Sequence, residues 1–135
     1  MKCKYITFFI CFICIICMMI CMCSCKKKNI CIREDSFFSS FKVQDEKVYI
    51  YCTLFIDNPT EAEKSIALQA LLENDVENGL LKEALIDAYS IDENTKHFQL
   101  QKGENRLEVV FIGEHAGGYK KHDRALPVIK ILETY

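Results

Sequence analysis

The stretch VYIYCTLFID, residues 48–57, constrains the fold of this chain more than any other segment. Its side chains alternate between two sets, which is the period of a β-strand. One set is Val48, Ile50, Cys52, Leu54 and Ile56, and the other is Tyr49, Tyr51, Thr53 and Phe55. Because both sets are mostly apolar or aromatic, we expect both faces of this strand to be partly covered. Asn58-Pro59-Thr60 then ends the strand as a turn.

Further strands are predicted on both sides of this one. The patch SFFSSF, residues 36–41, leads into a first edge strand, and residues 96–101 and 106–113 form a strand pair around the turn KGEN. Residues 127–133 form the last strand. The side chains expected to face the core in these later strands are Phe98, Leu100, Leu107, Val109, Phe111, Ile129 and Ile131.

Two segments fit either a helix or a strand. Thr60-Glu61-Ala62-Glu63 matches a capping box, and residues 60–73 contain good helix formers. The apolar residues of that segment nevertheless alternate as they do in a strand. Residues 80–89 are equally ambiguous, and NDVENG, residues 74–79, reads as a turn whose Asp75 and Glu77 are solvated.

Short segments separated by turns predict an all-β fold, a β-sandwich over residues 41–135. The strand that ends in NPT and the later KGEN hairpin resemble the immunoglobulin-like domains of small secreted or lipid-anchored bacterial proteins of unknown role. The chain lacks the Trp of antibody domains. The alternative is an α+β fold, with helices at 60–73 and 80–89 on an antiparallel sheet.

The first 28 residues carry a different signal. Lys2 and Lys4 precede an apolar run over residues 5–22, which is the layout of an export signal or a membrane anchor. The following MCSC, residues 22–25, resembles a bacterial lipobox. That resemblance implies cleavage before Cys25 and attachment of a lipid to its thiol.

Residues 1–24 would then be a lipoprotein signal peptide and residues 25–40 a polar tether that starts with three lysines. The expected location is the extracytoplasmic face of the cell membrane, held by the lipid anchor. The alternatives are an uncleaved N-terminal transmembrane anchor and a plain signal peptide. The three lysines after the apolar run disfavour export as an uncleaved anchor, because positive residues mark the cytoplasmic side.

The charge and the cysteines follow the same division of the chain. Fifteen of the seventeen Lys and Arg and all nineteen acidic residues follow Cys25, which gives residues 26–135 a net charge of −4. Such a surface argues against nucleic-acid binding. The cysteines before Cys25 belong to the apolar segment, where Cys acts as a small hydrophobe. Cys31 and Cys52 are expected to be free thiols, with a disulfide as the alternative.

The segment GEHAGGYKKHDRALP, residues 113–127, is the candidate ligand or partner loop. Its charged and imidazole groups could share a divalent metal or receive an anionic group. The favoured interpretation is a solvated connection between strands, so no metal or cofactor is predicted. The candidate residues are Glu114, His115, Lys120, Lys121, His122 and Arg124, with Asp123 as a further carboxylate.

No nucleophile elbow, H-E-x-x-H or phosphate-binding Gly-Lys motif is present, so the sequence predicts no enzyme. We expect an extracytoplasmic binding or structural module that contacts another envelope protein or a cell-wall polymer. The alternative is a small envelope enzyme or a metal-dependent accessory subunit with its site in residues 113–127.

Overall fold

The computed structural model describes residues 29–118 and 124–134, and these form a mostly antiparallel β structure. One short helix, α2, accompanies eight strands in this part of the chain. The strands are β1 (Cys31–Ile32), β2 (Phe37–Gln44), β3 (Lys47–Asn58), β4 (Lys64–Leu71), β5 (Leu85–Ser90), β6 (Phe98–Leu100), β7 (Gly103–Glu114) and β8 (Val128–Thr134), and α2 is Glu73–Glu77. The all-β prediction is therefore confirmed.

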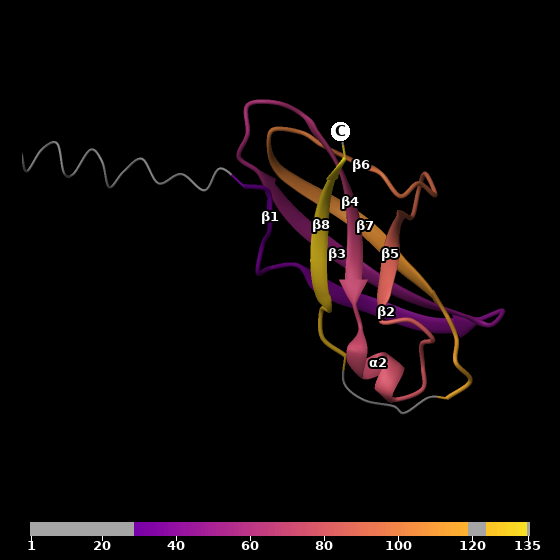
Figure 1. The fold of residues 1–135 in the computed structure, drawn as a ribbon. Helices are drawn as coiled ribbons and strands as arrows, with labels where there is room; N and C mark the ends of the chain where they lie inside the picture. Colours follow the sequence, from indigo (N-terminus) through magenta and orange to yellow (C-terminus); the bar gives the residue numbers. More distant parts are fainter. Residues whose placement is uncertain (1–28, 119–123, 135) are drawn as a thin grey trace, which may run out of the picture.

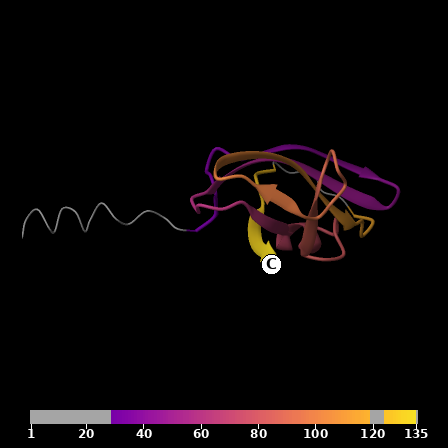
Figure 2. The same cartoon turned by 90° about the horizontal axis from the view of Figure 1, so that it is seen from above.

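The strands form two layers that share β5. In one layer β3 pairs with β7 along its whole length, and with β1 and β2 on its other edge. In the other layer β4 lies between β8 on one side and β5 and β6 on the other (Figure 1). The first half of β5 pairs with β4 and its second half, from Ala88, pairs with β7. Figure 2 shows the indigo strands of the first layer above the yellow β8 of the second.

The predicted alternation of β3 is confirmed and places the core between the layers. Val48, Ile50, Cys52, Leu54 and Ile56 are at most 1% exposed. They face buried side chains of the other strands, and the principal ones are Ile66, Leu68, Phe98, Leu100, Val109 and Phe111. Leu107, Ile129 and Ile131 pack against the edge of this cluster, as predicted.

Each of the two ambiguous segments contains a strand. Residues 64–71 form β4, and Ile66, Leu68 and Ala70 are at most 1% exposed. Residues 85–90 form β5. The helices that the α+β alternative places at 60–73 and 80–89 are therefore wrong. Burial of one face of an alternating segment outweighs the few tenths of a kcal/mol per residue that helix propensity contributes.

The paired region begins before the predicted boundary at residue 41. Cys31 and Ile32 pair with Asp57 and Ile56, and β2 starts at Phe37, all within the stretch for which the sequence predicts a tether. Among the residues that the structure describes, no helix is long and apolar enough to span a membrane.

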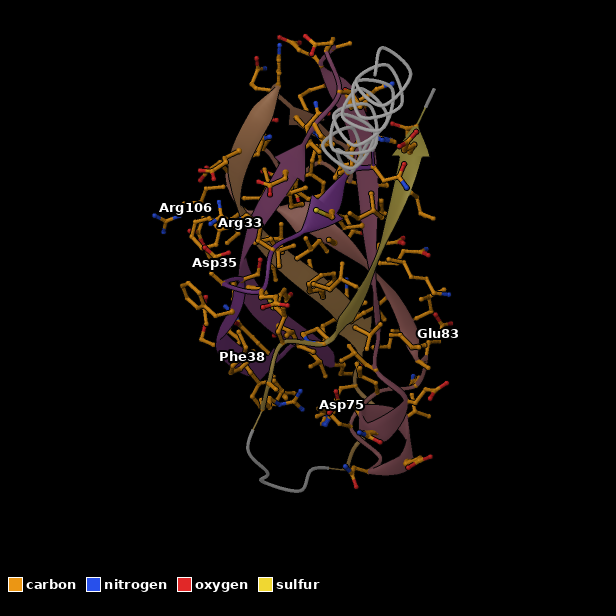
Figure 3. The ribbon with its side chains drawn as sticks, turned by 90° about the vertical axis from the view of Figure 1, so that its left-hand side faces the viewer. Arg33, Asp35, Phe38, Asp75, Glu83 and Arg106 are labelled. Carbon is orange, nitrogen blue, oxygen red and sulfur yellow. The ribbon has the colours of Figure 1, made fainter. Side chains whose placement is uncertain are left out.

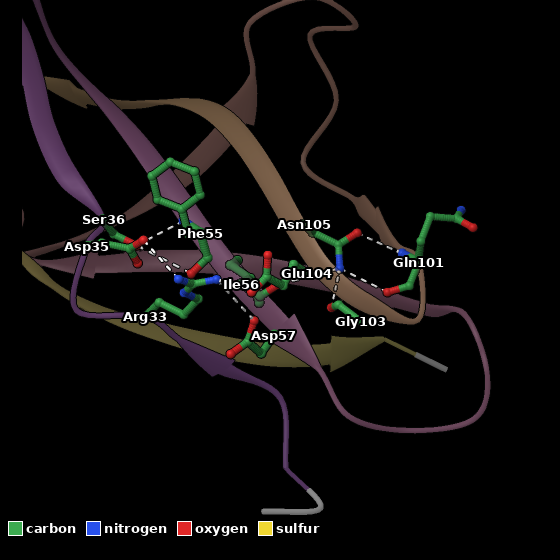
Figure 4. A network of polar contacts seen from close by, with 10 residues as sticks. All are labelled: Arg33, Asp35, Ser36, Phe55, Ile56, Asp57, Gln101, Gly103, Glu104 and Asn105. Atoms are coloured by element: carbon green, nitrogen blue, oxygen red, sulfur yellow. Dashed lines mark hydrogen bonds and ion pairs between the residues drawn. The ribbon is translucent and has the colours of Figure 1, made fainter.

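Polar contacts hold this N-terminal end against β3 and β7 (Figure 4). Arg33 bonds to Asp35 at 3.1 Å and to Glu104, and it lies 4.0 Å from Asp57. The Ser36 hydroxyl accepts a 2.9 Å hydrogen bond from the amide of Phe55. These contacts fix β1 at the Asn58 end of β3.

Both cysteines in the described part of the chain are free, as expected. Cys52 is 1% exposed, and desolvation by burial raises the pKa of its thiol to about 12. Since only the thiolate reacts, its reactive fraction at neutral pH falls by roughly a thousandfold relative to an ordinary thiol.

Alkylation of the folded chain is therefore expected to modify Cys31 and to leave Cys52 unmodified until urea unfolds the domain. Mass spectrometry of the alkylated peptides measures both sites in one sample. Modification of Cys52 at the rate of Cys31 under native conditions would contradict its burial.

Candidate functional site

The candidate loop begins as an ordered segment at the α2 end of the structure. Residues 114–118 run beside residues 79–82 and are joined to them by backbone hydrogen bonds. The amide of Lys82 donates to the carbonyl of Glu114 (3.1 Å), Ala116 donates to Leu80 (2.9 Å) and Gly118 donates to Gly79 (2.9 Å). The first part of residues 113–127 is therefore an extension of the sheet.

Glycines permit this close approach. A Cβ atom on Gly118 would lie 2.9 Å from the carbonyl oxygen of Gly79, and one on Gly113 would lie 2.7 Å from a methyl group of Leu81. Gly79 itself has φ +74°, a conformation that glycine adopts without strain. The glycines that the sequence suggests for turns thus also set the distance between two backbone segments.

Glu114 and His115 line a cleft of about 430 Å³ beside the β2–β3 turn. The other lining residues come from that turn, from Lys82 and from Ala116 and Gly117. Glu114 pairs with Lys82 at 3.2 Å, and both side chains are exposed. The backbone amide of His115 donates to the carbonyl of Glu46. The ring Nε2 of His115 lies 3.1 Å from the carbonyl oxygen of Gly118. His115 is thus tied to its own loop and to the β2–β3 turn.

Arg124 lies apart from this cleft, in a buried ion pair. Its guanidinium donates two hydrogen bonds to the carboxylate of Asp75, at 2.6 and 3.2 Å. The two side chains are 10% and 5% exposed. The guanidinium also lies 4.4 Å from the ring centroid of Phe41, a cation–π distance. Arg124 therefore joins β2, α2 and the segment that enters β8.

Sequence reasoning treated Asp75 as part of a solvated turn, and that interpretation is wrong. Asp75, which is labelled in Figure 3, is 4% exposed. Its backbone carbonyl also accepts hydrogen bonds from the amides of Leu80 and Leu81. Arg124 lies 49 positions away in sequence, and no local pattern links the two residues. The sequence alone therefore could not show that Asp75 and Arg124 form a pair.

A second cleft, of about 370 Å³, opens beside the ion pair. Residues 71–75 form one wall and residues 124–128 form the other. It offers backbone groups and apolar side chains next to a guanidinium that Asp75 already engages.

The remaining candidates, Lys120, Lys121 and His122, lie outside the described residues, as does Asp123. Within residues 29–118 and 124–134, no three His, Cys, Asp or Glu side chains converge as a metal site. Comparisons of the chain with protein-family models, with curated proteins and with solved structures found no match.

Proposed function

We propose that this protein is a lipid-anchored, extracytoplasmic binding or structural module with an immunoglobulin-like β-sandwich domain. Cys25 carries the lipid in this proposal, and the domain contacts another envelope protein or a cell-wall polymer. The lipobox-like MCSC supports the anchor, although these residues lie outside the described part of the chain. Two layers of antiparallel strands that are joined through β5 support the immunoglobulin-like domain.

The observation that carries the proposal is the position of the two clefts relative to the start of the domain. The chain enters through β1, which pairs with Asp57 near one end of β3. The cleft with Glu114 and His115 includes Lys47, at the other end of β3. Ten residues of extended strand separate these positions by about 33 Å. A lipid at Cys25 would thus attach the chain at the end of β3 that lies far from this cleft.

Metabolic labelling with a palmitate analogue tests the anchor. The wild-type chain is expected to take up the label, and Cys25→Ala is expected to lose it. Cys23→Ala is the matched control, because it removes a neighbouring thiol and keeps the proposed attachment site. Equal label in wild type and Cys25→Ala would contradict the proposal.

Protease treatment of intact spheroplasts tests the side of the membrane. An extracytoplasmic domain is expected to be degraded while a cytoplasmic marker protein survives. Protection of the domain until the membrane is lysed would mean that it faces the cytoplasm.

A further inference from the structure

The outer face of the β2–β3–β7–β5 layer carries a group of aromatic and apolar residues beside the exposed carboxylate of Glu108. The residues of β3 that alternate with the core set point away from the core, and so do their partners on β7. Tyr51 pairs with Val110, which pairs in turn with Tyr89, and Tyr49 pairs with Ile112. All three tyrosines of the described residues thus lie on this one face.

Charged residues surround this group. In the strand register, Lys47 lies opposite Glu114 at one end of β3 and β7, and Phe55 lies opposite Arg106 near the other end. Figure 3 shows Arg106 projecting on the side of the molecule opposite Glu83. Lys42 lies 5.1 Å from the centroid of Tyr49, at the β2 side. An aromatic centre with a charged rim is the usual composition of a protein–protein interface.

We propose that this face binds the same face of a second copy of the chain, as a two-fold symmetric dimer. A two-fold axis that runs along the strands, midway between β3 and β7, places the β3 of each copy over the β7 of the other. Each β3 residue of one copy then lies over the β7 residue of the other copy that is its partner in the strand register. Packed sheets keep their strands within about 30° of each other, at a separation of about 10 Å, which this arrangement satisfies.

Four of the six outward-facing rows are complementary when stacked in this way, and Glu108 would meet Thr53. In the sixth row Asp57 would meet Glu104, two carboxylates that Arg33 contacts in each copy. Lys47 of each copy meets Glu114 of the other, which gives two ion pairs by symmetry. Tyr49 meets Ile112, and Tyr51 meets Val110. Phe55 meets Arg106, which already lies 6.0 Å from the centroid of Phe55 in its own chain. The two Lys47–Glu114 ion pairs and the two contacts of Phe55 with Arg106 favour a second copy in this orientation.

The direction of the axis has a second consequence. Because the axis runs along the strands, the β1 ends of both copies lie on the same side of the dimer. Two chains anchored in one membrane could therefore form it. This compatibility rests on the proposed anchor, whereas the complementarity of the faces does not.

Photo-crosslinking of the full chain in its own cells tests the proposal. Tyr51→p-benzoylphenylalanine, and separately Tyr89→p-benzoylphenylalanine, places the reactive group on this face. Val128→p-benzoylphenylalanine is the control, since Val128 is 66% exposed on β8 of the other layer. We expect an adduct with twice the mass of the chain from the tyrosine positions and none from Val128. Adducts with other proteins only, no adduct, or an equal dimer yield from Val128 would each overturn the proposal.

Charge exchange tests the arrangement of the two copies. Lys47→Glu and Glu114→Lys each turn both intermolecular ion pairs into repulsions, so each variant alone is expected to lose roughly fivefold or more of the cross-linked dimer. Co-expression of the two variants with different tags is expected to restore a mixed dimer, because both ion pairs then form again, one of them with its charges exchanged. Undiminished dimer in either single variant, or no recovery on co-expression, would overturn the arrangement. Labelling of Cys25 is measured separately, so failure of the anchor and failure of the dimer give distinct results.

Discussion

Arg124→Ala is expected to lower the free energy of unfolding by about 3 to 5 kcal/mol. The substitution leaves the Asp75 carboxylate 5% exposed without the guanidinium that donates two hydrogen bonds to it. It also removes the cation that lies on the ring of Phe41. Urea unfolding of the purified full chain in detergent, followed by circular dichroism, measures the change.

Two further variants make this prediction specific. Arg124→Lys keeps the charge but loses the two-pronged geometry of the guanidinium. Its free energy of unfolding is therefore expected to lie between those of wild type and Arg124→Ala. Lys82→Ala breaks the exposed pair with Glu114 and is expected to cost less than about 1 kcal/mol. Equal stability of Arg124→Ala and Lys82→Ala would show that the buried pair does not stabilise the fold.

Phe111→Ala is expected to lower the free energy of unfolding by a similar amount, about 3 to 5 kcal/mol. Phe111 is fully buried, and it pairs directly with Ile50 of β3 and Ala88 of β5. Removing its ring opens a cavity at the point where the two layers share a strand. Since small domains are stable by only about 5 to 15 kcal/mol, this loss is a large part of the total.

Phe37→Ala is the matched control for the ring. Phe37 is 48% exposed on the edge strand β2, so its loss is expected to change the free energy by about 0.5 kcal/mol or less. The same urea titration measures both variants. A cost for Phe111→Ala no greater than that for Phe37→Ala would contradict the placement of Phe111 in the core.

Local pattern was sufficient for the strands that have one buried face and a clear turn. The alternation in residues 48–57 predicts β3 and its buried set. The predicted KGEN hairpin is wrong, because β6 pairs with β4 while β7, which already begins at Gly103, pairs with β3 and β5. Local pattern was also insufficient at residues 60–73, where a capping-box pattern and helix formers compete with alternation. There the decision depends on what the other layer buries, which no window of local sequence contains.

The candidate site was less predictable than the fold. Residues 113–127 are identifiable by their charge and glycine content, but Glu114 and His115 lie in one cleft while Arg124 lies beside another. Asp75 was missed as the partner of Arg124, because a surface turn and a buried carboxylate have the same local sequence. The short strand β1 was missed as well, since two residues carry no periodicity.

The sharing of β5 has a consequence for how the domain loses its structure. The first three of its six residues pair with β4 and the last three pair with β7, so displacing the whole of β5 breaks the ladders of both layers. Backbone amides in β4 and β7 are therefore expected to exchange their hydrogens with water in one common event. A polypeptide that passes from one layer to the other in mid-strand makes a single cooperative unit out of two.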